Sequence, residues 1–184
     1  MAERVLDAPE ETWHLNNGLE ALLRPLRPTD LPLHRELYYN CSPQSVFQRF
    51  FQVIERTKVT DAEVARYTAF DRRRELAITA VAHPGNGPEY GVVRLVNLGG
   101  GLAEFALLVA DPWQRQGLGR RLLEKAIETA GLHRLDRLRG YVLGDNQPML
   151  RLCRRLGFEL RYLNGEGMYE AELALPRSLT SVSP

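Results

Sequence analysis

The sequence contains little cysteine and no long apolar run, and both absences limit where the protein can work. Its two cysteines, Cys41 and Cys153, fit reduced thiols in a reducing cytosol better than a disulfide framework. No apolar stretch approaches the ~18 residues that a membrane-spanning helix needs. The first 15 residues include acidic side chains and lack the apolar core of a signal peptide. We therefore expect a cytoplasmic protein without a membrane partner.

The sequence also lacks metal-ligand motifs and a strong net charge. The four histidines, at positions 14, 34, 83 and 133, are too scattered to form a ligand motif, so we expect no metal site. The formal net charge of +1 gives no overall electrostatic attraction to nucleic acid or to a membrane surface. Lysine is scarce as well: of the 24 basic residues, Lys58 and Lys125 are lysines and the others are arginines.

Length and composition favour one folded domain. The chain has 184 residues, and its hydrophobic fraction of 44% is sufficient for a buried core. We expect a flexible lead-in at residues 1–12, a single domain at residues 13–175, and a flexible tail at residues 176–184, where Ser, Thr and Pro predominate.

The hydrophobic pattern predicts an α/β protein in which helices cover both faces of a mixed, mostly antiparallel sheet. Short Gly- and Pro-containing turns join the central strands, as in an antiparallel meander. Apolar residues recur every four positions from Leu118 to Ala130, which indicates a helix packed on the sheet. The predicted order is a hairpin or strand at 13–27, helices starting near residues 29, 42 and 60, strands at 76–82, 90–97 and 102–109, a helix at 118–131, a strand at 137–143, a helix after 146, and strands at 158–163 and 168–175.

The segment Asp111–Leu123, with the sequence DPWQRQGLGRRLL, is the most informative part of the chain. It follows the apolar strand at 102–109 and runs into a helix. A turn here directs backbone N–H groups and the positive end of the helix dipole at one point, which suits an anion and phosphate above all. Gly117 and Gly119 let a bulky diphosphate approach the backbone, and positive φ costs them little. An ordinary strand-to-helix turn is the alternative.

The glycine spacing distinguishes among the known phosphate-binding loops. The dinucleotide fingerprint G-x-G-x-x-G fails because position 122 is leucine, and no G-K-[ST] run occurs. The pattern present is Gln114-x-x-Gly117-x-Gly119 between a strand and an amphipathic helix. It resembles the acetyl-coenzyme A loop of the GNAT acyltransferase superfamily. The resemblance covers residues 13–175 and implies the GNAT fold, with a seven-stranded sheet splayed between strands 4 and 5 and acetyl-CoA bound in the wedge.

Three further segments resemble one branch of that superfamily, the bacterial Pat-type protein lysine acetyltransferases. The first and third segments discriminate best, since general GNAT enzymes usually lack them. The resemblance implies acetyl transfer to a protein lysine, with AMP-forming acyl-CoA synthetases as the favoured class of partner. The segments are Leu23–Asp30 followed by Ser42-Pro43-x-Ser45 and Arg49-Phe50-Phe51; Ala103-Glu104-Phe105-Ala106; and Asn146-x-Pro148-Met149 followed by Leu156-Gly157-Phe158.

Glu104 is the candidate general base. A lysine amine has an ordinary pKa of about 10.4, so at neutral pH it is protonated and cannot attack a thioester until a base removes the proton. Strand alternation places Glu104 on the same face as Ala106 and Leu108, within an apolar run that partly desolvates the carboxyl group. The resemblance agrees, because Pat-type enzymes carry their catalytic glutamate in this A-E-F-A segment. A solvated glutamate at a strand end is the alternative.

The expected contacts to acetyl-CoA come from a strand, a loop and a helix start. Backbone groups of the strand would pair with the pantetheine amides, and a bulge there would aim a donor at the thioester oxygen. The loop would hold the pyrophosphate, with Arg121 as a further charged neighbour. Asn146 would reach pantetheine or a phosphate oxygen while capping its helix. The strand residues are Leu107, Leu108 and Val109, and the loop residues are Gln114, Arg115, Gln116, Gly117, Leu118, Gly119 and Arg120.

One position departs from the common GNAT pattern. Many members have a tyrosine general acid in the helix before a Gly-Phe pair, and here that position is Cys153. A thiol can donate a proton, but an inward-facing core cysteine is the simpler interpretation, so no general acid is assigned. Because Cys153 is not placed for a covalent acyl intermediate, we expect direct attack in a ternary complex.

Three functions compete at this point. The leading hypothesis is a protein lysine acetyltransferase. The second is acetylation of a small amine, such as a polyamine or an antibiotic. A deep acidic pocket beside Glu104 would favour the second, whereas an open groove would favour a protein lysine. The third is a non-catalytic acyl-CoA-sensing module, which would need the loop but no base.

Overall fold

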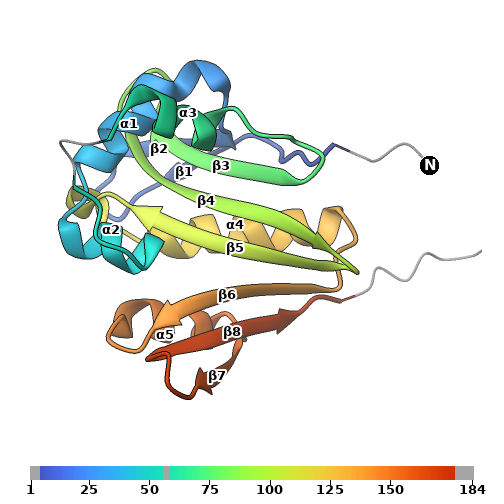
Figure 1. Cartoon of the computed structure of the whole chain (residues 1–184). Coiled ribbons are helices and arrows are strands. Elements are labelled where there is room, and N and C mark those ends of the chain that lie inside the picture. Colours follow the sequence, from blue (N-terminus) through green and yellow to red (C-terminus); the bar gives the residue numbers. More distant parts are fainter. Residues whose placement is uncertain (1–4, 56–58, 177–184) are drawn as a thin grey trace, which may run out of the picture.

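The computed structural model describes residues 5–55 and 59–176. Within this part of the chain, eight strands form one sheet in the order β1-β2-β3-β4-β5-β6-β8-β7 (Figure 1). Neighbouring strands are antiparallel except β5 and β6, which are parallel. The strands are β1 (Glu11–His14), β2 (Glu20–Pro25), β3 (Glu75–Ala82), β4 (Glu89–Gly99), β5 (Leu102–Val109), β6 (Arg137–Leu143), β7 (Glu159–Leu163) and β8 (Met168–Ala174).

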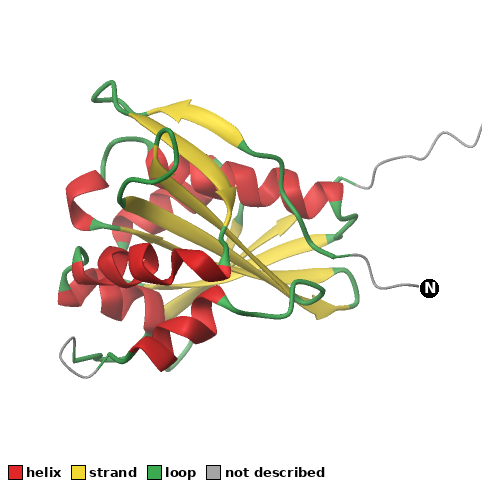
Figure 2. Cartoon of the chain, turned by 90° about the horizontal axis from the view of Figure 1, so that it is seen from above, coloured by secondary structure: helices red, strands yellow, loops and turns green. Residues whose placement is uncertain are grey.

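Helices cover both faces of this sheet (Figure 2). On one face, Leu37 and Val46 form a core with Leu108 of β5. On the other face, Leu122 and Cys153 belong to the larger core. The helices of the first face are α1 (Leu31–Tyr39), α2 (Pro43–Phe50) and α3 (Asp61–Thr68); those of the second core are α4 (Leu118–Leu132) and α5 (Gln147–Arg155), and short 3-10 turns lie at Pro28–Asp30 and Asp111–Trp113.

Strands β5 and β6 diverge, and their divergence makes the main opening in the fold. They pair over three rungs, the last of which joins Glu104 to Arg139, whereas β5 pairs with β4 along its whole length. In Figure 1 the two ribbons lie together at the starts of the strands and separate towards their ends. The predicted fold class is therefore confirmed, including the splay between the strands predicted at 102–109 and 137–143.

The N-terminal region differs from the prediction. The segment at 13–27 is a hairpin, in which β1 pairs with β2, so the sheet has one strand more than expected. The boundary of the expected lead-in is wrong, because β1 begins at Glu11 and the side chains of Leu6 and Ala8 are buried in the core. The N–H of Leu6 also donates to the carbonyl of Arg72 at 2.8 Å. Residues 1–4, and the expected tail from residue 177 onwards, lie outside the described residues.

Local capping fixes three of the predicted helix starts. The Ser42 side chain accepts an N–H from the first turn of α2. Thr60 and Glu63 form a reciprocal capping box at the start of α3. Asn146 caps α5 by accepting the N–H of Met149 at 3.2 Å. Each cap satisfies a backbone donor that the helix itself leaves without a partner.

A charge cluster fastens β1 to α4. Glu11 accepts hydrogen bonds from Arg121 Nη2 at 2.5 Å and from Lys125 Nζ at 3.0 Å, and Lys125 is buried. Hydrogen bonding by Arg121 lowers the pKa of Glu11 to about 2. The cluster holds the hairpin beside the start of α4, where the Trp13 ring adjoins Gly117. Arg121 is thus engaged by Glu11, and not by the loop for which it was considered.

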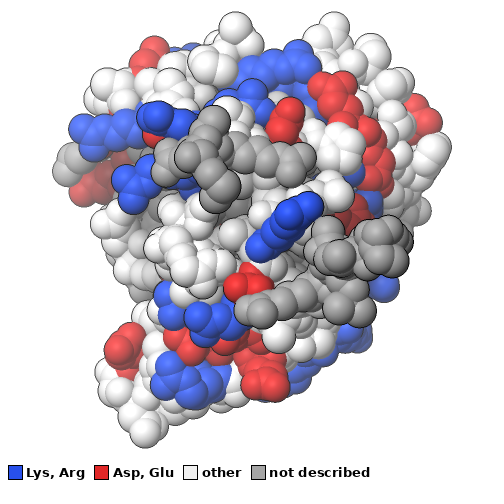
Figure 3. Space-filling view, turned by 90° about the vertical axis from the view of Figure 1, so that its right-hand side faces the viewer, with Lys and Arg blue, Asp and Glu red and all other residues white. Residues whose placement is uncertain are grey.

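The surface charge is mixed. Figure 3 shows the end of the molecule from which the chain termini leave, and there basic and acidic side chains lie side by side. This distribution agrees with the net charge of +1. None of the helices in the described part has the length and apolar content needed to cross a bilayer.

Candidate active site

The loop between β5 and α4 contains two residues in the left-handed conformation. Arg115 has a φ of 60° and Gly117 a φ of 83°. A Cβ at Gly117 would lie 3.1 Å from the Trp13 ring, so both the conformation and the packing require glycine there. The sequence does not indicate the conformation of Arg115, because residues other than glycine rarely adopt it. Left-handed residues in such a turn are typical of backbone anion-binding nests.

The N-terminus of α4 is open to a ligand. Gly117 is the N-cap, and no side chain caps this helix end. The N–H groups of the first turn therefore have no intrahelical acceptor, and they offer an anion both donors and the helix dipole. Gly119 does not adopt a positive φ, so it does not use the conformational freedom of glycine. Its contribution is space, since an added Cβ would meet only Leu107 and Val109, at 3.7 and 3.8 Å.

The edge of β5 that faces β6 is unpaired beyond Glu104 within the described sheet. Leu107 and Leu108 lie on this stretch, and their backbone groups can pair with an extended ligand as they would with a strand. The expected bulge is not found in this stretch of the described strand. The register with β4 runs without a shift from Ala103 to Val109, and the irregularity lies between Asn97 and Gly99 instead.

A wedge of about 1030 Å³ opens where β5 and β6 separate. Gln116 and Leu118, although expected to bind the cofactor, do not line it. The side chain of Leu118 is buried in the core, and the carbonyl of Gln116 accepts the N–H of Asn16. The other expected cofactor residues all line the wedge, namely Leu107, Leu108, Val109, Gln114, Arg115, Gly117, Gly119, Arg120 and Asn146.

Arginines from two helices gather at the wedge. Arg151 and Arg155 of α5 line it together with Arg115 and Arg120. The sequence pattern predicts that the arginines of α5 face away from the core, and all three are exposed. Two of them, Arg151 and Arg155, line the wedge. Their spacing of four residues places both on one side of the helix, and that spacing is the signal that could have identified them.

Gln114 links the cofactor loop to α2. Its Nε2 donates to Ser45 Oγ at 3.0 Å and to the Val109 carbonyl at 3.1 Å. Ser45 Oγ in turn donates to Asp111 Oδ1 at 2.8 Å, and the same oxygen accepts the N–H of Ser42 at 3.0 Å. The Ser42-Pro43-x-Ser45 motif thus fixes α2 against the loop. The amide group of Gln114 serves this link, which the sequence alone does not indicate.

Glu104 lies where the two strands separate. It is half-buried and lines the wedge. Leu108, which shares its face as predicted, packs with residues of α1 and α2. The carboxylate of Glu104 forms no hydrogen bond or ion pair with any residue that the structure describes. Its oxygens are therefore open to accept a proton from a group in the wedge.

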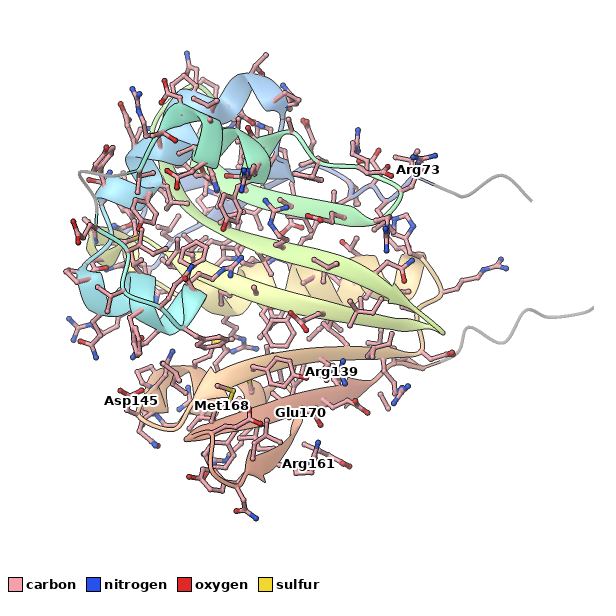
Figure 4. The ribbon with its side chains drawn as sticks, viewed as in Figure 1. Arg73, Arg139, Asp145, Arg161, Met168 and Glu170 are labelled. Atoms are coloured by element: carbon pink, nitrogen blue, oxygen red, sulfur yellow. The ribbon has the colours of Figure 1, made fainter. Side chains whose placement is uncertain are left out.

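The neighbouring cation binds elsewhere. Arg139 is the partner of Glu104 in the parallel ladder, but its Nη1 lies 3.7 Å from Glu170 Oε2. Its guanidinium also lies over the Tyr141 ring, 5.7 Å from the ring centroid. Figure 4 shows Arg139 and Glu170 close together on β6 and β8, with Arg161 of β7 nearby. Arg161 holds Glu170 from its other side, at 2.8 Å.

A second cavity, of about 540 Å³, adjoins the wedge beneath α1, α2 and α3, and we call it the helix-face cavity. It shares five lining residues with the wedge, namely Arg49, Phe50, Gln52, Tyr67 and Leu108. Its walls are mainly apolar, and arginines outnumber carboxylates among its lining residues, so it is not the acidic pocket that would favour a polyamine. The charged lining residues are Arg49, Arg66, Arg94, Glu55 and Glu63, with His34 beside them.

Cys153 is a core residue. Its side chain is fully buried on the inner face of α5 and does not line the wedge. Burial raises the pKa of the Cys153 thiol to about 12, so the group is a neutral thiol at physiological pH. The interpretation of Cys153 as an inward-facing core cysteine is confirmed.

The chain matches known acetyltransferases in sequence and structure. The acetyltransferase (GNAT) domain model matches residues 21–159. An acetyltransferase of Pseudomonas aeruginosa is 28% identical over 146 residues, which are 78% of this chain and 77% of that protein. The GNAT domain of PAT from S. lividans superposes with a TM-score of 0.80 at 25% identity, over 90% of this chain and 97% of that one. Spermidine N-acetyltransferase from Vibrio cholerae, solved with CoA and spermine, shares the fold, with a TM-score of 0.66 at 19% identity over 83% and 94% of the two chains.

The wedge fits the cosubstrate of this family. It offers an uncapped helix N-terminus, a glycine at position 119 that lets a ligand approach the backbone, an unpaired strand edge and several arginines. These features suit a phosphate-bearing molecule with an amide-containing arm. The family match covers most of the sequence. The chain therefore belongs to the GNAT acetyltransferase family and is an acetyl-CoA-dependent N-acetyltransferase.

Proposed function

We propose that the protein acetylates a lysine side chain of another protein, with Glu104 as the general base. The observation that carries the proposal is the carboxylate of Glu104, which lines the wedge beside the unpaired edge of β5 and has no partner among the described residues. The similarity to the GNAT domain of PAT, at 25% identity over 97% of that domain, supports a protein acceptor. The Pat-type segments make an AMP-forming acyl-CoA synthetase the first target to test.

The chemistry needs one proton acceptor. A lysine ammonium has an ordinary pKa of about 10.4 and becomes nucleophilic only after it loses a proton. Glu104 accepts that proton, directly or through a water molecule. Acetyl-CoA, when bound, would supply the acetyl group as an activated thioester, and CoA would leave as a thiolate that takes a proton from solvent. Direct attack by the amine is favoured because Cys153 is buried away from the wedge and cannot carry an acyl group.

The binding of acetyl-CoA is divided among the groups described above. Arg115, Arg120, Gly117 and the first turn of α4, which includes the N–H groups of Leu118 and Gly119, would hold phosphate oxygens. The backbone of Leu107, Leu108 and Val109 would pair with the amides of the arm. Asn146 caps α5 and also lines the wedge, so both roles assigned to it are compatible.

One other class of acceptor remains as an alternative. A small-amine acetyltransferase is supported by the helix-face cavity, whose volume of about 540 Å³ suits a small molecule. Its arginines disfavour a polycationic acceptor. The third hypothesis, a non-catalytic acyl-CoA sensor, is disfavoured by the family match. It is also disfavoured by Glu104, because a sensor does not need a carboxylate without a partner at the point where β5 and β6 separate.

The test is acetyl-CoA turnover, measured as released thiol, with an acyl-CoA synthetase, a cell lysate and a set of small amines as separate acceptors. Wild type and Glu104→Ala are compared, and acetyl-CoA binding is measured by calorimetry for both. We expect the wild type to acetylate protein lysines. The Glu104→Ala variant should lose at least ~10²-fold in turnover rate, whereas its affinity for acetyl-CoA should not change. Turnover of small amines alone would select the second function. Binding without turnover of any acceptor would contradict the proposed protein-lysine acceptor.

A further inference from the structure

We infer that the helix-face cavity binds an anionic group of the acceptor, a carboxylate in the first instance, and that Arg49 is the residue that binds it. The inference rests on the proposed function, since it concerns the acceptor of the same reaction. It assigns a substrate chemistry: the acceptor amine is accompanied by a carboxylate and an apolar body.

Arg49 is placed between the two cavities. It lies on α2 and lines both the wedge, where Glu104 stands, and the helix-face cavity. Its guanidinium stacks over the Phe50 ring, 4.7 Å from the centroid. It forms no hydrogen bond or ion pair with any residue that the structure describes. Its five N–H donors are therefore available to a ligand.

Arg94, the nearby cation of the same cavity, is already satisfied. Its Nη1 lies 2.7 Å from Glu75 Oε2, and its Nη2 donates to the carbonyl of Tyr67. Its guanidinium also stacks over the Phe70 ring, at 4.6 Å from the centroid. Arg94 thus ties β4 to α3 and adds positive charge to the cavity. Of the other two arginines that line the cavity, Arg66 is exposed, and Arg49 is the half-buried one that has no counter-ion among the described residues.

The carboxylates of the cavity do not compensate Arg49. Glu63 accepts the N–H and the hydroxyl of Thr60 in the capping box. Glu55 lines the cavity as well, but it forms no ion pair with Arg49 and makes an interaction of its own. Glu104 attracts Arg49 only through space. A bound anion would supply the missing partner, and a guanidinium–carboxylate pair forms charge-assisted, often bidentate hydrogen bonds.

The electrostatics agree with this geometry. Burial and the charge of Arg94 lower the pKa of Arg49 to about 10, against the opposing effects of Tyr67 and Glu104. Arg49 therefore remains charged at neutral pH, although its surroundings disfavour the charge. Half-buried charges without a partner are costly, and such groups are concentrated at functional sites.

The cavity and the wedge are neighbours, because the same five residues line both: Arg49, Phe50, Gln52, Tyr67 and Leu108. An acceptor with its carboxylate at Arg49 and its apolar part against Leu108 can direct its amine towards Glu104. Two sources provide this chemistry: a small amino acid with a terminal amine, and a protein lysine with an acidic residue beside it.

The experiment uses matched acceptors that differ only in charge. One pair is 6-aminohexanoate and its amide; the other is a lysyl peptide with an aspartate next to the lysine and the same peptide with asparagine. We expect the wild-type kcat/KM to be at least about tenfold higher for the carboxylate member of at least one pair, which is the magnitude of a hydrogen-bonded charged group. The pair that responds identifies the source of the carboxylate.

Variants assign the effect to Arg49. Arg49→Gln should abolish the carboxylate preference, while Arg49→Lys should restore part of it because the charge is retained. Arg154→Gln removes an exposed arginine that does not line either cavity, and it should keep the full preference. Melting temperatures of all variants, together with the KM for acetyl-CoA, separate a binding role from a folding defect.

Two outcomes would overturn the inference. One is equal kcat/KM for the members of both pairs with the wild type. The other is a carboxylate preference that survives in Arg49→Gln. If no acceptor is turned over, calorimetry of the same four acceptors with the CoA-bound wild type decides the matter, because equal affinity within each pair contradicts the inference. Failure of the proposed function is a different result, in which protein lysines are not acetylated while a carboxylate-bearing small amine is.

Discussion

Glu104 and Arg139 form the last parallel rung before β5 and β6 separate, yet they do not form an ion pair. Opposite charges at such a position usually attract each other across the strands. Here Glu170, which Arg161 also holds, draws Arg139 away. The result is a carboxylate that stays close to a cation without being neutralised by it, at the point where the sheet opens.

The first prediction concerns Glu104→Gln, which keeps the shape of the side chain and removes the base. We expect kcat to fall by at least ~10²-fold at pH 7 with little change in acetyl-CoA affinity. Activity of the variant should then rise with pH towards the ordinary amine pKa of about 10.4, since the free amine must come from solution. A pH–rate profile of both proteins checks this. A variant with wild-type kcat would remove Glu104 from the mechanism.

The two loop glycines should respond differently to alanine. Gly119→Ala adds a methyl group at ordinary contact distance from Leu107 and Val109, so the protein should fold normally while the KM for acetyl-CoA rises about tenfold. Gly117→Ala should destabilise the protein by about 1–3 kcal/mol, because alanine must adopt a positive φ against Trp13. Thermal melting and cofactor titration of both variants distinguish the two effects. Equal loss of stability in both would contradict the assignment.

Arg151 and Arg155 should contribute to the binding of the phosphorylated part of acetyl-CoA. The double variant Arg151→Gln/Arg155→Gln should raise the KM for acetyl-CoA by at least about tenfold and weaken its dependence on salt concentration. Arg154→Gln is the matched control, because Arg154 is exposed on the same helix but does not line the wedge. If the control raises the KM equally, the effect is one of general surface charge.

Glu11 should make stability depend on pH in the acidic range. Its pKa is lowered from 4.5 to about 2, chiefly by the hydrogen bond from Arg121, so its stabilisation is present above pH 4.5 and is lost as the pH falls towards 2. Glu11→Gln should cost about 2–4 kcal/mol at pH 7, because Lys125 is left buried without its carboxylate. Urea unfolding should show a smaller difference in the free energy of unfolding between the wild type and Glu11→Gln at pH 3 than at pH 7. A difference that is independent of pH would point to packing alone.

The thiol of Cys153 should be unreactive in the folded protein and should take no part in catalysis. The buried thiol, with a pKa of about 12, should react with iodoacetamide only after unfolding. Cys153→Ala should retain wild-type kcat, with a loss of about 1–2 kcal/mol in stability from the cavity that it leaves. Mass spectrometry of the labelled protein and steady-state kinetics check both points. A marked loss of kcat in a well-folded variant would reinstate Cys153 as a participant in the reaction.

The sequence predicts those features that depend on local patterns. The Gln114-x-x-Gly117-x-Gly119 spacing locates the turn that has left-handed Gly117 and an uncapped helix start, and strand alternation places Glu104 on the face that it shares with Leu108. The splay between β5 and β6 is also correct, although it follows from the family resemblance and not from periodicity.

Features that depend on tertiary contacts are not predicted. No local pattern indicates that the guanidinium of Arg49 has no counter-ion among the described residues, because that depends on which carboxylates the surrounding helices and strands bring near it. The burial of Leu6 and Ala8 is missed because two isolated apolar residues in an acidic segment show no periodicity. The link from Gln114 to Ser45 joins residues 69 positions apart in sequence, and it exists only once α2 docks beside the loop.

The pairing of Lys125 with Glu11 has a consequence for experiments on this enzyme. Lys125 is the one lysine in the described part of the chain, and only 4% of its surface is accessible. Its amine donates to the carboxylate of Glu11 and cannot reach the wedge of another molecule unless the contact between β1 and α4 opens. Peptides from the described part of the enzyme should therefore keep a constant mass during the reaction. They provide an internal standard against which acetylation of an added protein is quantified in the same digest.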